Sequence, residues 1–298
     1  MKNFKYILMV LIGGIMYGTM SSFVKLFYSR GYNAAELSFS QALLAAVFLG
    51  IFLLLSGKSE KRKLPKKEVI SLLITGGCIG LTNYLYYQSV SYISASLAIV
   101  ILMQFTWFSL LLEWGIFRKK PGKPELLTVI FILIGTVMAG NLFYAGKLSF
   151  SWKGLTFVLC SSMTYAIYIV ANSRVGKNVN WLPKSTMIMT GSALTIFIVN
   201  ANTILTGSHF SYEFVLIAVF LAVIGTAIPT ALFAAGIAKI GAGVSSILMT
   251  VELPVAIICA TIVLNERISA LQIVGILIML IAISAMNYYK SLITKKAG

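Results

Sequence analysis

Hydrophobic residues make up 59% of this 298-residue sequence and charged residues only 11%, and the mean hydropathy is +0.93. A soluble domain normally carries about 25% charged residues, so the composition excludes a soluble protein and predicts an integral membrane protein. The net charge of +16 does not indicate a nucleic-acid partner, because the cations gather in the short segments between apolar stretches.

Ten apolar stretches, each about long enough to cross a bilayer, follow one another along the chain. A hydrocarbon core of about 30 Å requires about 20 apolar residues in a helix. Continuous apolar runs such as 215–228 and 273–283 lack the period-two alternation of a membrane β-barrel. We therefore predict an all-α integral membrane protein with ten transmembrane helices. Their expected ranges are 6–28, 34–55, 69–90, 93–117, 126–143, 154–172, 185–205, 212–236, 243–264 and 269–289.

Most of the 24 Lys and Arg residues fall on one side of the membrane if the ten helices alternate in direction. Lys184 is counted there, in the segment between the sixth and seventh helices. The opposite side receives Arg30, Lys147, Lys153 and Arg267. Because cytoplasmic segments carry the excess of Lys and Arg, both termini are expected in the cytoplasm, in a multi-pass protein of the plasma (inner) membrane. Anionic lipid headgroups are the expected partners of these cations.

Several kinds of functional site are not expected in this chain. Cys78, Cys160 and Cys259 lie within predicted helices without a CxxC pair, and His209 is the single histidine, so neither a disulfide nor a metal site is expected. The chain has no aspartate, no phosphate-binding GxxxxGK[ST] motif and no catalytic triad, so we expect neither an enzyme nor a cofactor. The apolar run at the N-terminus extends past Leu26, which is too long for a typical cleaved signal peptide.

The chain repeats once, with a shift of about 147 residues. Under this shift the turn Tyr92–Leu97 falls on Lys239–Val244, and Tyr17 falls close to Tyr165. The two predicted units, 1–147 and 148–298, each hold five helices. Because five is odd, the second unit is expected to insert upside down, and inverted repeats place a substrate site near the midplane where the units meet.

Several short motifs occur in a characteristic order: Tyr17-Gly18 with Lys25, the turn 240–243, Glu252-Leu253-Pro254, and Asn265-Glu266-Arg267. With them the chain resembles the drug/metabolite transporter superfamily and, within it, the ten-helix EamA-domain transporters. The resemblance implies export of amino acids or related metabolites, with drug-like solutes as a variant. The first half departs from the family pattern, because Trp107 stands where a proline is usual and Lys119 where a glutamate is usual.

In the first half, ionisable and polar side chains within helices mark candidate sites, because such groups are costly in lipid and usually face a partner or a cavity. Lys25 shares a helix face with Tyr17 and can either reach the interface or pair with Glu252 or a substrate carboxylate. Glu113, near the cytoplasmic end of its helix, can pair with Arg118 or Lys119, snorkel, or take part in transport. Tyr17, Tyr84, Gln104 and Trp107 are candidates for substrate binding.

In the second half, Ser161, Tyr165, Tyr168 and Asn172 form a polar stripe on one helix face. From this stripe we choose Tyr165 and Asn172 as substrate-binding candidates. The alternative for the tyrosines is an aromatic belt at the membrane interface, which fits Tyr165 poorly because it is expected deep in the helix.

Glu252 is the strongest single candidate, because it is expected about ten residues into the ninth helix and just before Pro254. A proline removes one helical hydrogen bond and can kink a helix, so Pro229 and Pro254 are candidate hinges. A carboxylate beside such a kink can bind a cationic group or carry a coupling proton. The alternative is a protonated side chain that bonds structurally to a neighbouring helix.

Together these features predict a secondary transporter, most simply an exporter, of a small organic solute such as an amino acid or related metabolite. It would work by alternating access, driven by the solute gradient or by protons. The alternative is a membrane-embedded flippase or enzyme that acts on a lipid-linked metabolite. Gly14/Gly18 and Gly76/Gly80 have the spacing that allows close helix contact, and we expect these contacts within one monomeric chain.

Overall fold

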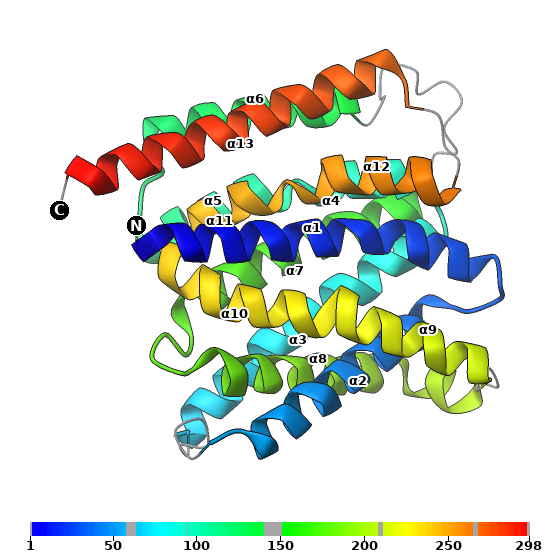
Figure 1. Ribbon diagram of the computed structural model, residues 1–298. Coiled ribbons are helices and arrows are strands. Elements are labelled where there is room, and N and C mark those ends of the chain that lie inside the picture. Colours follow the sequence, from blue (N-terminus) through cyan, green and yellow to red (C-terminus); the bar gives the residue numbers. More distant parts are fainter. Residues whose placement is uncertain are drawn as a thin grey trace.

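The computed structural model describes residues 2–57, 64–93, 95–139, 151–207, 211–264 and 268–296, which form helices and connecting turns without a strand (Figure 1). The helices are α1 (Lys2–Tyr28), α2 (Ala34–Leu55), α3 (Lys66–Val90), α4 (Ala95–Leu102), α5 (Phe105–Phe117), α6 (Lys123–Ala139), α7 (Trp152–Arg174), α8 (Trp181–Thr206), α9 (Tyr212–Ala222), the π-helical turn η2 (Val223–Ala227), α10 (Ile228–Ile240), α11 (Ala242–Met249), α12 (Glu252–Leu264) and α13 (Ala270–Lys296).

Within these described ranges, eight helical segments are long and apolar enough to cross a membrane. The pairs α4 and α5, and α11 and α12, each contribute to one such segment, as do α9, η2 and α10 together. Ala270–Met286 is a shorter apolar helix, and α6 is described over 17 residues. Outward-facing side chains are often large and apolar, for example Ile262, which is 74% exposed. The all-helical membrane fold is thus confirmed, and the number of ten transmembrane helices stays a prediction.

Two of the predicted helices are interrupted near their middle. A turn separates Leu102 at the end of α4 from Phe105 at the start of α5, and another separates Met249 at the end of α11 from Glu252 at the start of α12. Phe105 and Glu252 coincide under the repeat shift of about 147 residues. Pro254 accounts for the second break, because it has no N–H for the carbonyl of Thr250. That carbonyl instead accepts a 3.2 Å bond from the Leu253 N–H.

The helices pack in a pattern that stays the same when each is exchanged for its counterpart in the other half. In the first half α1 packs against α10 and α12, and in the second half α7 packs against α3 and α5. The self-paired contacts are α2 with α8 and α6 with α13, the latter pair lying side by side along one flank (Figure 1). The predicted boundary between residues 147 and 148 lies outside the described residues.

Glycines allow the closest of these helix contacts. A Cβ atom added at Gly80 would lie only 2.8 Å from the carbonyl oxygen of Ser192 in α8, and one at Gly76 would overlap the Ile188 carbonyl. The prediction that this glycine pair packs within the chain is therefore confirmed. Gly135 and Gly275 make the equivalent crossing between α6 and α13.

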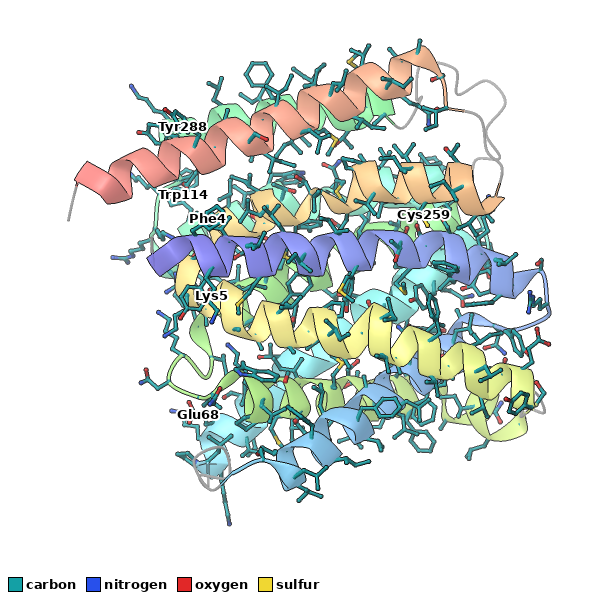
Figure 2. The ribbon with its side chains drawn as sticks, viewed as in Figure 1. Phe4, Lys5, Glu68, Trp114, Cys259 and Tyr288 are labelled. Atoms are coloured by element: carbon teal, nitrogen blue, oxygen red, sulfur yellow. The ribbon has the colours of Figure 1, made fainter. Side chains whose placement is uncertain are left out.

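The two ends of the described chain lie at the same end of the bundle (Figure 1). Figure 2 shows Lys5 and Glu68 at this end and Cys259 toward the opposite end. A chain that crosses the membrane an even number of times has both its ends on the same side, as seen here. The assignment of this end to the cytoplasm stays a prediction.

The expected position of Lys184 between two helices was wrong. The Asn180 side chain caps the start of α8 at Trp181, so Lys184 lies in the first turn of α8 and its side chain is fully buried. Its Nζ donates a 2.7 Å hydrogen bond to the carbonyl oxygen of Asn172 in the last turn of α7. A cation at this position compensates the negative end of the α7 dipole.

Candidate substrate site

A narrow cavity lies where the two halves of the chain meet, and its free volume is about 30 Å³. It is enclosed by α1, α2, α3, α4, α7, the turn η2 and α12. Its lining combines aromatic rings with hydroxyl, amide and carboxyl groups. The described lining residues are Tyr17, Met20, Ser21, Gln41, Thr82, Asn83, Tyr86, Tyr87, Ile99, Leu102, Tyr165, Gly225 and Glu252.

Glu252 enters this cavity from the break between α11 and α12. It is the first residue of α12, and its side chain is 2% exposed. The Tyr165 hydroxyl donates a 2.6 Å hydrogen bond to its Oε1. The structure thus brings together Glu252 and Tyr165, two residues that the sequence named separately.

The close approach of α1 holds the Glu252 backbone in place. Gly18 faces the break, and a Cβ atom there would lie 2.6 Å from the Glu252 carbonyl oxygen. Glycine therefore allows α1 to contact the start of α12 directly, which positions the neighbouring Tyr17 beside the cavity.

Aromatic rings build one wall of the site around Tyr165. The rings of Tyr17 and Tyr165 are stacked, with centroids 6.5 Å apart and an interplanar angle of 19°. Phe105, the first residue of α5, packs at 4.7 Å from the Tyr165 ring, and Phe233 at 5.5 Å from the Tyr17 ring. The four residues of the predicted α7 stripe are all buried, so that face of α7 points into the protein as expected.

Several lining residues were not chosen from the sequence. Gln41 on α2 accepts a 3.1 Å hydrogen bond from the Tyr87 hydroxyl. Tyr86, which is 7% exposed, has a buried hydroxyl that lies near Ser21 and makes no hydrogen bond of normal geometry with any residue that the structure describes. The polar character of Asn83 and Tyr87 within a membrane helix could have indicated them as candidates. The sequence did not show which face of α3 points into the cavity.

Four of the predicted substrate-binding residues do not line this cavity, and three of them belong to α3 and to the start of α5. Tyr84 packs against a small cluster formed by Ala42 of α2 with Ala193 and Ile196 of α8. Gln104 lies in the break before α5 and accepts a 2.6 Å bond from Trp107 Nε1. Trp107 faces a separate apolar cleft between α5 and α6.

Asn172 lies outside the cavity as well, although it is fully buried. Its Nδ2 donates a 3.1 Å hydrogen bond to the Tyr168 hydroxyl. Its backbone carbonyl accepts the hydrogen bond from Lys184 Nζ. Asn172 therefore links α7 to α8 at the end of the bundle that carries Lys184.

Glu113 forms a polar junction near the end of α5. Its Oε2 lies 3.2 Å from Lys119 Nζ, and its Oε1 lies 3.0 Å from Arg174 of α7. The Gly243 N–H of α11 also donates to Oε2, at 3.2 Å. The pairing with Lys119 was one of the predicted alternatives, whereas the links to α7 and α11 could not be expected from the sequence.

The remaining candidates lie at helix ends and turns. Lys25 is half-buried in the last turn of α1 and does not line the cavity. Pro229 is the second residue of α10, the helix that directly follows the π-helical turn η2, and η2 contributes Gly225 to the lining. Pro254 lies in the first turn of α12. Both prolines thus lie where helical hydrogen bonding is irregular, and their role as hinges stays a prediction. In the described ranges, no three His, Cys, Asp or Glu side chains gather as metal ligands.

A helical membrane protein with a repeated unit and a central polar cavity has the architecture of a small-molecule transporter. A family model described as the EamA-like transporter family matches residues 4–140 and again residues 152–288. The chain therefore belongs to this family, within the drug/metabolite transporter superfamily, and it carries the family domain twice.

Known proteins with similar sequences carry transporter names. Uncharacterized transporter YcbK of Bacillus subtilis is 24% identical over 96% of this chain and 94% of its own length. Uncharacterized transporter sll1319 of Synechocystis is 25% identical over 72% of this chain and 66% of its own length. GDP-fucose transporter 1 of Dictyostelium discoideum is 29% identical over 46% of this chain and 34% of its own length.

A chain of known crystal structure shares the fold. It aligns with a TM-score of 0.69 over 93% of this chain and 94% of its own length, at 14% identity. The structural match supports a shared architecture, and at this low identity it says nothing about the solute.

Proposed function

We propose that this protein is a secondary transporter that exports a small organic solute, such as an amino acid or a related metabolite, by alternating access. The observation that carries the proposal is the hydrogen-bonded pair of Glu252 and Tyr165 in a cavity shared by both halves. Substrate sites of repeat-built transporters lie at such an interface, beside discontinuous helices.

We further propose that the two halves are inverted relative to each other and that both termini face the cytoplasm. The segments between helices carry an excess of Lys and Arg on the side of the termini, which supports this orientation. The protein would act as a monomer in the plasma (inner) membrane, because one chain already encloses the cavity.

Glu252 is the proposed coupling site. A buried carboxylate is costly unless a proton or another cation neutralises it. A proton on Glu252 in one conformation and a different neutralising partner in the other would couple solute movement to the proton gradient. Tyr165 would hold the carboxyl group in a fixed position in the cavity.

A nucleotide sugar is a poor fit for this cavity, although one relative is named a GDP-fucose transporter. A diphosphate is recognised by cations and clustered N–H donors. The described residues that line the cavity include one carboxylic acid and no Lys, Arg or His. A solute without phosphate groups is therefore favoured.

Transport of a labelled amino-acid and amine mixture into proteoliposomes, with and without an imposed pH gradient, tests the proposal. Accumulation that depends on the pH gradient in the wild type, with loss of this dependence in Glu252→Gln, would support it. Glu213→Gln is the matched control, because Glu213 lies in an exposed ion pair with Arg30. Unchanged pH-driven transport in Glu252→Gln would rule out Glu252 as the coupling site.

A further inference from the structure

The cleft between α5 and α6 lies away from the central cavity and is much larger. Its free volume is about 330 Å³, whereas that of the central cavity is about 30 Å³. α6 packs mainly against α13, which leaves its α5 side partly open. The cleft faces the outside of the bundle, because Leu111 and Trp114 of α5 and Leu126 of α6 are each nearly half exposed. In a membrane-embedded chain this surface contacts lipid.

The wall that α5 contributes is apolar and elongated. It is formed by residues at the helical spacing i, i+3, i+4 and i+7, which are Trp107, Leu110, Leu111 and Trp114. The Trp107 N–H already donates to Gln104, so its ring offers only apolar surface to the cleft. At 1.5 Å per residue the wall is about 10 Å long, which is most of one leaflet, half of a hydrocarbon core of about 30 Å. This shape suits a hydrocarbon chain.

One end of the cleft is positively charged. Lys120 is the one charged side chain among the described lining residues, and Arg118 and Lys123 are exposed in the same connecting segment. Residues 118–125 hold four cations and one carboxylate, Glu125, which accepts the Gly122 N–H at 2.9 Å. An anion beside Lys120 therefore meets a net positive charge.

The position of Trp114 relates this charged end to the membrane surface. Figure 2 shows Trp114 at the end of the bundle that also carries Lys5 and Glu68. Tryptophans gather at the level of the lipid headgroups. The cleft thus runs from headgroup level, where Lys120 lies, toward the acyl region, where Trp107 lies.

The repeat does not account for the two aromatic rings. Under the shift of about 147 residues, Pro254 and Thr261 stand where the first half has Trp107 and Trp114. The aromatic wall is therefore a feature of the first half alone, and the duplicated architecture does not require it.

From the apolar wall and its cationic end we infer that this cleft binds one anionic phospholipid, with the phosphate at Lys120 and an acyl chain against Trp107 and Trp114. Basic pockets between transmembrane helices hold anionic headgroups in this way. A zwitterionic phospholipid with the same chains fits the wall equally well, but its headgroup cation opposes Lys120. The inference depends on the membrane-embedded fold and not on the proposed transport function.

Quenching of tryptophan fluorescence by brominated lipids tests the inference, because bromine quenches the rings that it contacts. The reporter protein carries Trp152→Phe and Trp181→Phe, which leaves Trp107 and Trp114 of the four tryptophans. Brominated phosphatidylglycerol and brominated phosphatidylcholine with identical chains are compared in nanodiscs of unlabelled phosphatidylcholine. We expect half-maximal quenching at an about fivefold lower mole fraction of the glycerol lipid, the factor for one cation near the membrane surface.

Two charge variants of the reporter separate a built site from general attraction to a basic surface. Lys120→Gln should remove the about fivefold preference, and the variant is expected to fold because Lys120 is exposed. Lys177→Gln is the matched control, since Lys177 is an exposed cation between α7 and α8, on the same expected side of the membrane, and does not line the cleft. Equal losses in the two variants would overturn the inference.

Three other outcomes would also overturn it. Equal quenching by the two brominated lipids means lipid contact without selection. Quenching by neither lipid means that something else covers the cleft, such as a second copy of the chain. Displacement of brominated phosphatidylglycerol by its deacylated headgroup, glycerophosphoglycerol, means that Lys120 binds a soluble anion and that the apolar wall holds no acyl chain.

Discussion

The Tyr165 hydroxyl lies 2.6 Å from Glu252 Oε1, so the stripe of α7 and the break between α11 and α12 meet at one hydrogen bond. Both residues belong to the second half of the chain. The first half contributes Tyr17, whose ring stacks on Tyr165, and Gly18, which contacts the Glu252 backbone. The site is therefore completed across the interface between the halves.

The Tyr165→Phe substitution should weaken both folding and transport. It leaves Glu252 without its hydrogen-bond donor, and an unsatisfied buried group costs about 1–3 kcal/mol. We expect a lower unfolding temperature in detergent and slower solute exchange than in the wild type. Nanoscale fluorimetry and proteoliposome exchange would measure the two effects, with Tyr92→Phe as control. A wild-type exchange rate in Tyr165→Phe would show that this hydrogen bond does not serve transport.

Gly18→Ala adds a single methyl group, yet it should strongly lower the stability of the fold. The added methyl group would lie 2.6 Å from the Glu252 carbonyl oxygen, so α1 would have to move away from α12. Overpacking of this kind typically costs about 1–3 kcal/mol. Gly115→Ala in α5 is the control, because nothing lies within 4 Å of a Cβ atom there. Equal thermal stability of the two variants would contradict the close approach.

Glu113 and Arg174 should be energetically coupled. Their 3.0 Å ion pair joins α5 to α7, and Glu113 is nearly fully buried while the Arg174 side chain is 29% exposed. A double-mutant cycle with Glu113→Gln and Arg174→Gln should give a coupling energy above about 0.5 kcal/mol. The exposed pair of Arg30 and Glu213 should give less, because surface ion pairs contribute about 0–1 kcal/mol. Coupling of equal size in the two pairs would show that the buried junction is not special.

Cysteine labelling should locate the two faces of the membrane. In a variant in which Cys78, Cys160 and Cys259 are replaced, Lys119→Cys should react with an impermeant maleimide only after the cells are opened. Arg30→Cys should react in intact cells. The reason is that Lys119 lies in a segment rich in Lys and Arg, which is expected in the cytoplasm, whereas Arg30 lies at the opposite membrane face. The reverse pattern would overturn the proposed orientation.

The sequence predicted the positions of the helices and the buried face of α7 well, because apolar length and polar stripes are local properties. It could not predict that Tyr165 points at Glu252, since this depends on the rotation and contacts of separate helices. The choice of Tyr84 on α3 shows the difficulty. This helix packs against α2, α7 and α8, so polar residues on several of its faces are buried. Among residues 83–88, those that line the cavity are Asn83, Tyr86 and Tyr87.

The two helix breaks and Lys184 show how local signals differ in strength. Pro254 indicated the break before Glu252, whereas the equivalent break before Phe105 has Trp107 at the matching position and no proline to indicate it. Lys184 was misplaced because its charge outweighed the Asn180 cap. An Asn followed by an apolar segment with Pro183 near its start is a helix-start signal that was present in the sequence.

The junction at Glu113 has a consequence for the energy of opening. One carboxylate holds Lys119, Arg174 and the Gly243 N–H, and Arg174 also lies 3.6 Å above the Phe117 ring. α5 belongs to the first half of the chain and α7 and α11 to the second. If the two halves move apart at this end during the proposed cycle, these groups become exposed to water. Hydration then replaces the broken bonds, so the barrier is set by the moment at which the groups have separated but are still dry. Water entry at this end of the bundle, more than the strength of the ion pairs, would then govern how fast the protein changes face.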